Sequence, residues 1–186
     1  MTWCCHGPFC VFDVETTGMS PARDRIVELA ALRVECDGSR RRFHSLVNPG
    51  RPIPRGVIRI HHIDDAMVAD APDFAAVAAR FLPFIEGATL VAHNARFDLG
   101  FLQESLNRCG LPLWRGRTLD TVRLMRTVYP GLPSYRLQTL RTIFRLDAPD
   151  SEFQDAHRAA ADVDWTMQLL KLALTAAETH TAGAPR

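Results

Sequence analysis

The sequence predicts an α/β protein with a mixed sheet flanked by helices, and three features of the chain lead to that prediction. Apolar and β-branched segments near the N-terminus are separated by turn-forming residues, which is typical of an antiparallel meander. Later in the chain, short apolar segments alternate with amphipathic helical patterns, and a long helical pattern comes last. With 186 residues, 47% of them hydrophobic, one domain can bury its own core.

The strands are expected where apolar, β-branched or aromatic residues are bounded by turn signals. They are predicted at residues 8–14, 25–34, 42–47 and 88–92. Asp37-Gly38-Ser39 forms the turn between the second and third strands, and Asn48-Pro49-Gly50 ends the third. The first three strands therefore form an antiparallel meander, and we expect Arg40-Arg41-Arg42 in its solvated hairpin turn.

Helices are expected where apolar residues recur every three or four positions. They are predicted at residues 73–85, 94–107, 118–129, a short segment after residue 134, and about 156–177. Pro83 should kink or end the first of these early, while Asn94 and Ser134 are plausible N-caps. Residues 1–178 are therefore assigned to one domain, and 179–186 to a flexible C-terminal tail.

Composition excludes several classes of protein. The five cysteines are odd in number and lack the spacing of a disulfide framework, so a reducing, cytoplasmic setting is expected. Cys4, Cys5, His6 and Cys10 also lack the spacing of a zinc site. The longest apolar runs are far shorter than the roughly 20 residues that span a bilayer, so no membrane association is expected. The net charge of +1 by itself gives little reason to expect nucleic acid.

Asp13 and Glu15 are the first candidate metal ligands. They lie two residues apart on the first predicted strand, so both carboxylates point to the same face. Such neighbours repel each other unless a cation lies between them, and Mg²⁺ or Mn²⁺ prefers oxygen ligands. An Asp-x-Glu pair is also common on solvated strands, but the apolar neighbours Val11, Phe12 and Val14 favour an interior strand.

Three further polar residues have simple structural explanations when each is taken alone. Asp98 lies in the first turn of a predicted helix, where a carboxylate is favoured by the helix dipole whatever its function. His157 and Asp162 are five residues apart, which on a helix places them roughly 140° from each other. They converge only if His157 lies on the loop or first turn that leads into the last helix, and otherwise they are a surface histidine and a solvated aspartate.

Three segments in this order resemble the motifs of one known group of enzymes. They are Phe12-Asp13-Val14-Glu15-Thr16-Thr17-Gly18, His93-Asn94-Ala95-Arg96-Phe97-Asp98, and His157-Arg158-Ala159-Ala160-Ala161-Asp162. Together they resemble the DEDD superfamily of 3′-to-5′ exonucleases, in its histidine-containing (DEDDh) branch. That branch includes the proofreading exonuclease subunit of bacterial DNA polymerase III and ribonuclease T. The resemblance covers nearly the whole chain.

The resemblance implies an RNase H-like fold with a mixed five-stranded sheet, in which an antiparallel meander precedes parallel strands. It implies that Asp13, Glu15, Asp98 and Asp162 bind two Mg²⁺ or Mn²⁺ ions and that His157 is the general base. Residues expected to hold the terminal nucleotide are Thr16, Thr17, Gly18, Met19, His61, Asn94 and Phe97. For Phe97 the core and the nucleotide are equally favoured, and His62 is interpreted as structural.

The implied reaction releases nucleoside monophosphates from the single-stranded 3′ end of a nucleic acid. DNA is the favoured substrate, and RNA is the alternative. A further alternative is a catalytically silent nucleic-acid-binding or polymerase-associated domain, although no acidic position of the motifs is replaced. Proofreading with a DNA polymerase and stand-alone repair or trimming stay equally open, as do the strandedness of the substrate, the preferred metal and the oligomeric state.

Overall fold

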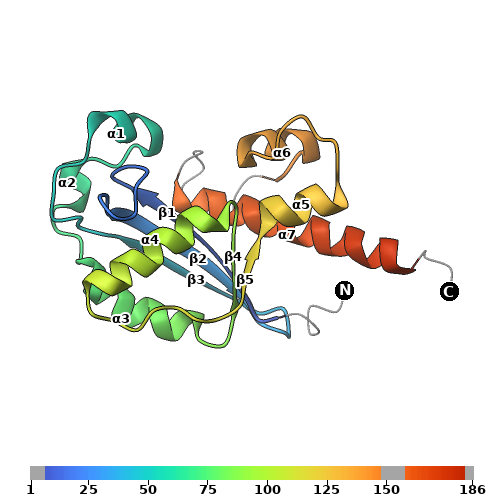
Figure 1. Ribbon diagram of the computed structural model, residues 1–186, viewed down its shortest axis with the longest axis horizontal. Coiled ribbons are helices and arrows are strands. Elements are labelled where there is room, and N and C mark those ends of the chain that lie inside the picture. The colour runs from blue at the N-terminus through green and yellow to red at the C-terminus, as the bar shows by residue number, and fades with distance from the viewer. Residues whose placement is uncertain (1–6, 148–157, 183–186) are drawn as a thin grey trace.

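The computed structural model describes residues 7–147 and 158–182, and five strands in it form one mixed sheet with the order β3-β2-β1-β4-β5 (Figure 1). The strands are β1 (Phe9–Thr16), β2 (Ile26–Val34), β3 (Arg40–Leu46), β4 (Thr89–Ala92) and β5 (Thr118–Asp120). β1, β2 and β3 pair antiparallel, whereas β4 pairs parallel with both β1 and β5. The predicted mixed, five-stranded sheet is therefore confirmed.

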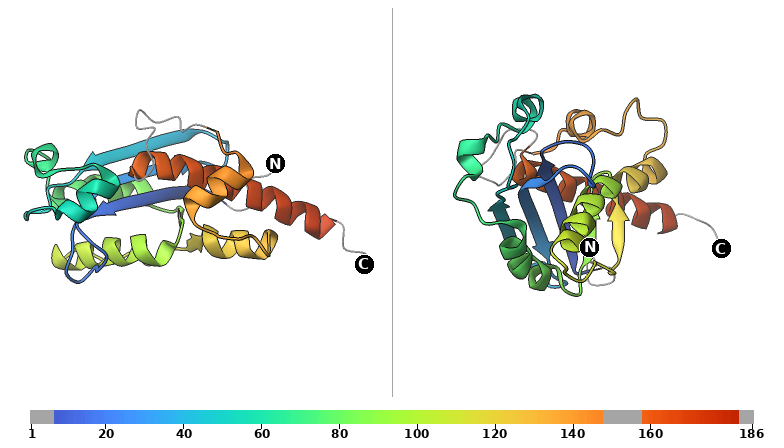
Figure 2. Two further views of the ribbon diagram at one scale, coloured as in Figure 1. Left: turned by 90° about the horizontal axis from the view of Figure 1, so that it is seen from above. Right: turned by 60° about the vertical axis from the view of Figure 1, so that its left-hand side comes forward.

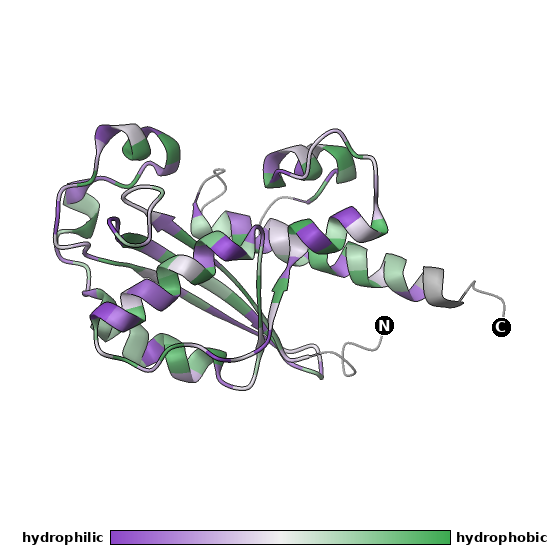
Figure 3. Cartoon of the chain, viewed as in Figure 1, coloured by the Kyte–Doolittle hydropathy of each residue, from purple (hydrophilic) through white to green (hydrophobic). Residues whose placement is uncertain are grey.

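Helices cover both faces of the sheet (Figure 2). They are α1 (Arg55–His61), α2 (Asp65–Val68), α3 (Phe74–Ile85), α4 (Ala95–Arg108), α5 (Thr121–Val128), α6 (Leu137–Phe144) and α7 (Ala159–Ala182). α3 and α4 pack on one face and α7 on the other, while α5 and α6 pack against α7. Hydrophilic and hydrophobic residues alternate along α4 and α5, as expected for helices with one solvated side (Figure 3).

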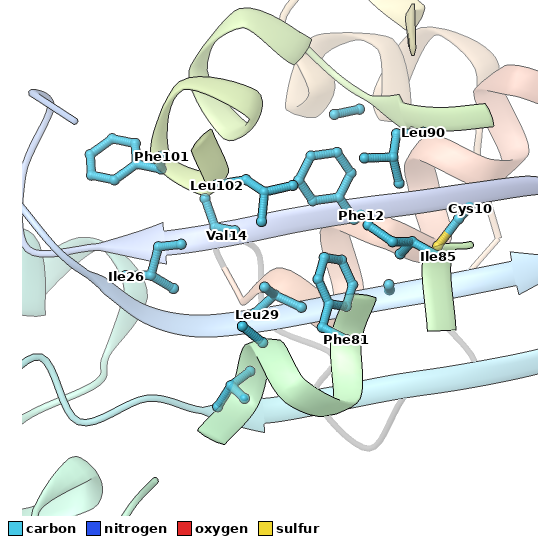
Figure 4. Packing of buried hydrophobic residues seen from close by; sticks show 14 of the residues in the cluster. Cys10, Phe12, Val14, Ile26, Leu29, Phe81, Ile85, Leu90, Phe101 and Leu102 are labelled. Carbon is cyan, nitrogen blue, oxygen red and sulfur yellow. The ribbon is translucent and has the colours of Figure 1, made fainter. Parts of the chain in front are cut away.

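β1 separates two hydrophobic clusters because its side chains alternate between the faces of the sheet. Cys10, Phe12 and Val14 join the cluster beneath α3 and α4 (Figure 4). In this cluster the ring centroids of Phe12 and Phe81 are 6.3 Å apart. Phe9 and Val11 instead pack toward α7. Asp13 and Glu15 continue this second row, so the alternation directs both carboxylates toward the α7 face.

Several predicted elements differ from the observed ones. Residues 118–120 form β5 instead of the first turn of a helix, and α5 begins only at Thr121. α1 and α2 had not been predicted. Pro83 lies inside α3, which continues to Ile85 without an early end. Arg40-Arg41-Arg42 belongs to the edge strand β3, not to the hairpin turn.

One predicted helix cap and one helix end are wrong, and a second cap is confirmed only in position. Asn94 occupies the N-cap position of α4, but its backbone is left-handed and its side chain makes no capping hydrogen bond. Arg136, not Ser134, precedes α6. α7 continues to Ala182, so residues 179–182 of the predicted tail are helical. The division into a domain at 1–178 and a tail at 179–186 otherwise stays a prediction.

Two expectations from composition can be compared with the described part of the chain. Within it, Cys10, Cys36 and Cys109 form no disulfide, whereas Cys4, Cys5 and His6 lie outside the described residues. Among the helices described, none has the length and apolar character that crossing a bilayer requires.

Candidate active site

Three acidic side chains meet at the end of the central strand. Asp13 and Glu15 come from β1, and Asp162 comes from the first turn of α7, which packs on the same face of the sheet. One carboxylate oxygen from each lies within 4.8 Å of the other two. The structure therefore brings together three of the four predicted metal ligands, from segments almost 150 residues apart in the sequence.

Asp98 approaches β1 from α4, which packs on the face of the sheet opposite to α7. It lies in the first turn of α4 with only 2% of its surface exposed, and its Oδ1 accepts a hydrogen bond from the Val14 amide at 3.2 Å. β4 pairs with β1 only as far as Val11, so the Val14 amide lies beyond the parallel pairing. The Asp98 carboxylate thus accepts the Val14 amide hydrogen bond at a point where β4 no longer pairs with β1. This bond holds the carboxylate beside Asp13.

These carboxyl groups resist ionisation when the protein holds no metal. Burial raises the pKa of Asp13 well above its usual range, and the charges of Asp98 and Asp162 raise it further. Burial and then Asp162 do the same for the pKa of Glu15. For Asp98, burial raises the pKa to about 8 although the Val14 amide opposes the shift. The cluster therefore requires either protons or cations, and its all-oxygen donors suit Mg²⁺ or Mn²⁺.

The metal-free protein should lose stability as the pH rises. The pKa values of Asp13, Glu15 and Asp98 are higher in the folded chain than in the unfolded chain. From about pH 4 upward, the native state therefore binds more protons than the unfolded state, and for Asp98 this difference extends through about pH 8. Stability is thus greatest near the lower end of this window and falls toward the upper end. Thermal unfolding between pH 5 and 8 in EDTA should show that fall.

Saturating Mn²⁺ should remove most of this loss, since a cation at 100 times its Kd stabilises the fold by about 2.7 kcal/mol. When the pH dependence of stability is compared with and without Mn²⁺, the contributions of titrating groups that lie outside the site cancel. Glu28, for example, has a pKa lowered to about 2, so its own contribution is lost only at pH below the window. Equal pH slopes in EDTA and in Mn²⁺ would contradict a cation site at these carboxylates.

The end of β1 and the loop that follows it carry four of the residues predicted to hold a nucleotide. Thr16 and Thr17 are buried and bind the loop itself: the Thr16 hydroxyl donates to the Gly18 carbonyl at 2.6 Å, and Thr17 Oγ1 accepts from the Arg25 amide at 3.0 Å. A Cβ atom on Gly18 would lie 2.5 Å from the Asp24 carboxylate, so a larger residue here would displace the Asp24 side chain, which accepts a hydrogen bond from the Ser20 amide. Met19 is 80% exposed at the loop tip, where it can contact a ligand.

The other three predicted nucleotide contacts lie on different elements. His61 is buried at the end of α1, and its Nδ1 accepts a hydrogen bond from the Ile63 amide, so a neutral His61 carries its proton on Nε2. Asn94 is exposed before α4. Phe97 is partly buried, with its ring 4.9 Å from that of Phe101, which favours the core. Their contact with a nucleotide stays a prediction.

A groove of about 950 Å³ leads into the site beside Asp162. Its walls come from the segment after β4, from α5, and from the loop and first turn of α6. Gln138 lies in this wall, and its Nε2 donates to Asp162 Oδ1 at 3.4 Å. Gln138 had not been predicted as a site residue, because nothing in its local sequence distinguishes it from any exposed helical glutamine.

The predicted general base, His157, lies outside the described residues. The described chain resumes at Arg158, the residue before α7. Asp162 lies in the first turn of this helix. The requirement that His157 precede the helix is therefore consistent with the start of α7 at Ala159, but its catalytic role stays a prediction.

A mixed sheet whose central strand carries clustered carboxylates, joined by acids from two helices, fits the metal site of divalent-metal-dependent hydrolases, a class that includes nucleases. Residues 10–170 match the RNase_T exonuclease family, and the chain belongs to that family. It is thus a metal-dependent 3′-to-5′ exonuclease, as the predicted resemblance implied.

Similar proteins agree with this assignment. DNA polymerase III subunit epsilon of Treponema pallidum (strain Nichols) is 39% identical over 166 residues, which are 88% of this chain and 75% of the relative. The 3′-5′ exonuclease DinG of Bacillus subtilis (strain 168) is 38% identical over 159 residues, which are 85% of this chain but 16% of the relative. The chain thus spans most of the first relative and a small part of the second.

Solved structures show the same fold. Exonuclease X in complex with 5′ overhanging duplex DNA superposes with a TM-score of 0.74 at 31% identity, covering 91% of this chain and 93% of that one. E. coli exonuclease I in complex with a dT13 oligonucleotide gives a TM-score of 0.81 over 95% of this chain and 43% of that one. At 24% identity, this second likeness supports the fold alone.

Proposed function

We propose that this protein removes nucleoside monophosphates one at a time from the 3′ end of DNA by two-metal-ion hydrolysis. The observation that carries this proposal is the meeting of Asp13, Glu15 and Asp162 within 4.8 Å at the end of β1, with buried Asp98 on the adjacent helix. Four carboxylates match most of the charge of two divalent cations, which explains why so many acids can share one buried site.

Asp13, Glu15, Asp98 and Asp162 would hold the cations. When bound, these ions would help the attacking water lose its proton and would neutralise the charge that develops on the leaving 3′ oxygen. The protein supplies rigid positions for them, because Asp13 and Glu15 stand on a central strand and Asp98 is tied to the Val14 amide. His157, which precedes α7 in the sequence, would accept the proton of the attacking water.

The terminal nucleotide would lie between the loop after β1 and the segment before α4. Met19, which follows Gly18 in this loop, offers an exposed apolar surface against which any base can pack. Asn94 lies at the mouth of the 950 Å³ groove that also reaches Asp162. Contacts of this kind read each base alike, as an enzyme that trims arbitrary sequences requires.

The choice of DNA is supported by the relatives, since one is named as a DNA polymerase III subunit and one solved structure contains duplex DNA. A cytoplasmic enzyme of DNA repair or proofreading is the biological role that we propose. Association with a DNA polymerase is a further part of that proposal, and its support is the similarity to the epsilon subunit alone.

Digestion of matched oligonucleotides tests the proposal. Single-stranded DNA, duplex DNA with a recessed 3′ end, and RNA, each labelled at the 5′ end, should be incubated with 5 mM Mg²⁺ or Mn²⁺ and with EDTA. We expect single-nucleotide ladders from DNA in either metal and none in EDTA. A faster ladder from RNA would favour the exoribonuclease alternative, and intact substrates in every metal would favour a silent binding domain.

A further inference from the structure

Glu28 is a fully buried acid that the predicted mechanism does not use. It lies on β2 directly across from Glu15 in the antiparallel register, so both side chains belong to the face that α7 covers. Burial would raise the pKa of Glu28, but hydrogen bonds from His44 and Arg158 outweigh burial and lower the pKa to about 2. Glu28 is therefore an ionised carboxylate one strand away from the metal-binding acids.

The carboxylate of Glu28 is bound by three groups from outside its own strand. Arg158 donates from Nη2 to Oε1 at 2.8 Å and from Nε at 3.3 Å. The backbone amide of Ala159, the first residue of α7, donates to Oε2 at 2.9 Å. His44 on β3 lies 2.8 Å from Oε1. A strand residue thus caps the N-terminus of α7, a position where the helix dipole and the unsatisfied amides favour a carboxylate.

This cap connects directly to a metal ligand. The carbonyl of Arg158 accepts hydrogen bonds from the backbone amides of Ala161, at 3.0 Å, and of Asp162, at 3.1 Å. Arg158 is therefore held by Glu28 through its side chain, and it begins the helical turn that ends at Asp162. A shift of the cap would move Asp162 relative to Asp13 and Glu15 on β1.

We propose that Glu28 is a positioning residue for the exonuclease reaction, which holds the first turn of α7 so that Asp162 meets Asp13 and Glu15. This inference rests on the proposed two-metal function. It assigns no contact between Glu28 and either the substrate or a cation. A buried ion pair is weak as a source of stability by itself, which is why a geometric role is the better explanation for this one.

The Glu28→Gln variant tests the proposal, because glutamine keeps the shape of the side chain and removes its charge. Residues that orient metal ligands typically contribute 10- to 100-fold to metal affinity or activity. We expect kcat on single-stranded DNA to fall by about that factor, with KM for the oligonucleotide nearly unchanged. The folded variant, titrated with Mn²⁺ alone and followed by electron paramagnetic resonance, should bind the ion about 10-fold more weakly or worse.

Glu35→Gln is the matched control. Glu35 follows the end of β2 and also pairs with arginines, Arg33 at 2.6 Å and Arg41 at 3.1 Å. It makes no contact with α7 among its hydrogen bonds in the described structure. The control should keep the wild-type kcat and Mn²⁺ affinity, so any loss in Glu28→Gln reflects the cap and not the removal of an arginine partner from β2.

Arg158→Lys provides a second variant that keeps the positive charge but cannot form the forked contact. If Glu28→Gln does not fold, as judged by circular dichroism, Arg158→Lys should still fold and should show the loss of kcat and Mn²⁺ affinity. A folded Glu28→Gln, or failing that Arg158→Lys, with wild-type kcat and Mn²⁺ affinity would overturn the positioning role. Failure of the wild-type protein to cleave any substrate would overturn the proposed function instead.

Discussion

Replacement of Asp13 by asparagine should abolish cleavage and, at the same time, stabilise the metal-free protein. Burial opposes the ionisation of Asp13, and so do the charges of four neighbouring acids, Asp98, Asp162, Glu15 and Glu28. The amide keeps the shape of the side chain but has no charge to attract a cation or to repel those acids. Since a metal ion supplies several kcal/mol of transition-state stabilisation, we expect activity to fall at least about 10³-fold.

The substitution should raise stability although it lowers activity, because the carboxylates repel one another when no metal is bound. At pH 8 in EDTA, the free energy of unfolding of Asp13→Asn should be roughly 0.5 to 2 kcal/mol higher than that of the wild type. The gain should shrink toward pH 5, where the wild-type carboxyl groups are protonated, and it should reverse in saturating Mn²⁺. Urea unfolding under these three conditions measures all of these differences.

Asp37→Asn is the control for that experiment, because Asp37 lies in the exposed turn before β3 and its carboxylate accepts a local hydrogen bond from the Ser39 amide. It should leave cleavage and the response to Mn²⁺ unchanged. Wild-type cleavage by Asp13→Asn would remove Asp13 from the metal site. A metal-free Asp13→Asn that is less stable than wild type at pH 8 would show that Asp13 is held by favourable contacts and not strained by repulsion.

The carboxylate pair could be predicted from sequence because its signal is local. Asp13 and Glu15 share one face of a strand by the two-residue repeat, and the apolar neighbours Val11, Phe12 and Val14 place that strand inside the sheet. The structure confirms both points, and it also confirms that Asp162 joins them. The convergence of Asp162 was implied by the resemblance of motifs, since no rule of spacing relates residues 13 and 162.

The short elements were predicted poorly for a physical reason. β5 has three residues, Thr118 to Asp120, and its apolar content cannot be distinguished from the first turn of the helix that follows. Asp120 then caps α5 through the amides of Val122 and Arg123. Asn94 suits an N-cap by composition, but its left-handed backbone directs the side chain elsewhere, and the Asp120 carboxylate binds the Ala95 amide instead.

Supporting contacts were missed because they depend on distance in space. Glu28 and Arg158 are 130 residues apart, and each by itself resembles an ordinary charged residue. Gln138 contacts Asp162 from another helix. Periodicity shows which residues face the core of one element, but it does not show which polar groups from different elements meet there. Sequence therefore predicted the acids of the site better than the residues that hold them.

The His157→Ala variant should slow cleavage by about 10²- to 10⁴-fold without a comparable loss of metal binding, which would separate the general base from the metal ligands. An unperturbed histidine titrates near pH 6.5, so in saturating Mn²⁺ the wild-type rate should rise through that pH and then level off. The variant should lack this step, since hydroxide or buffer must then accept the proton. Single-turnover rates between pH 5.5 and 8.5 measure both effects.

His62→Ala is the matched control, because His62 is exposed at the end of α1 and its backbone amide, not its side chain, completes that helix by binding the Ile58 carbonyl. The control should keep the pH step and the rate. A His157→Ala protein with the same pH step as wild type would assign the titration to another group in the metal-bound site. Because Asp162 lies in the first turn of α7, five residues after His157 in the sequence, a variant that also lost Mn²⁺ binding would indicate a disturbed helix start instead of a missing base.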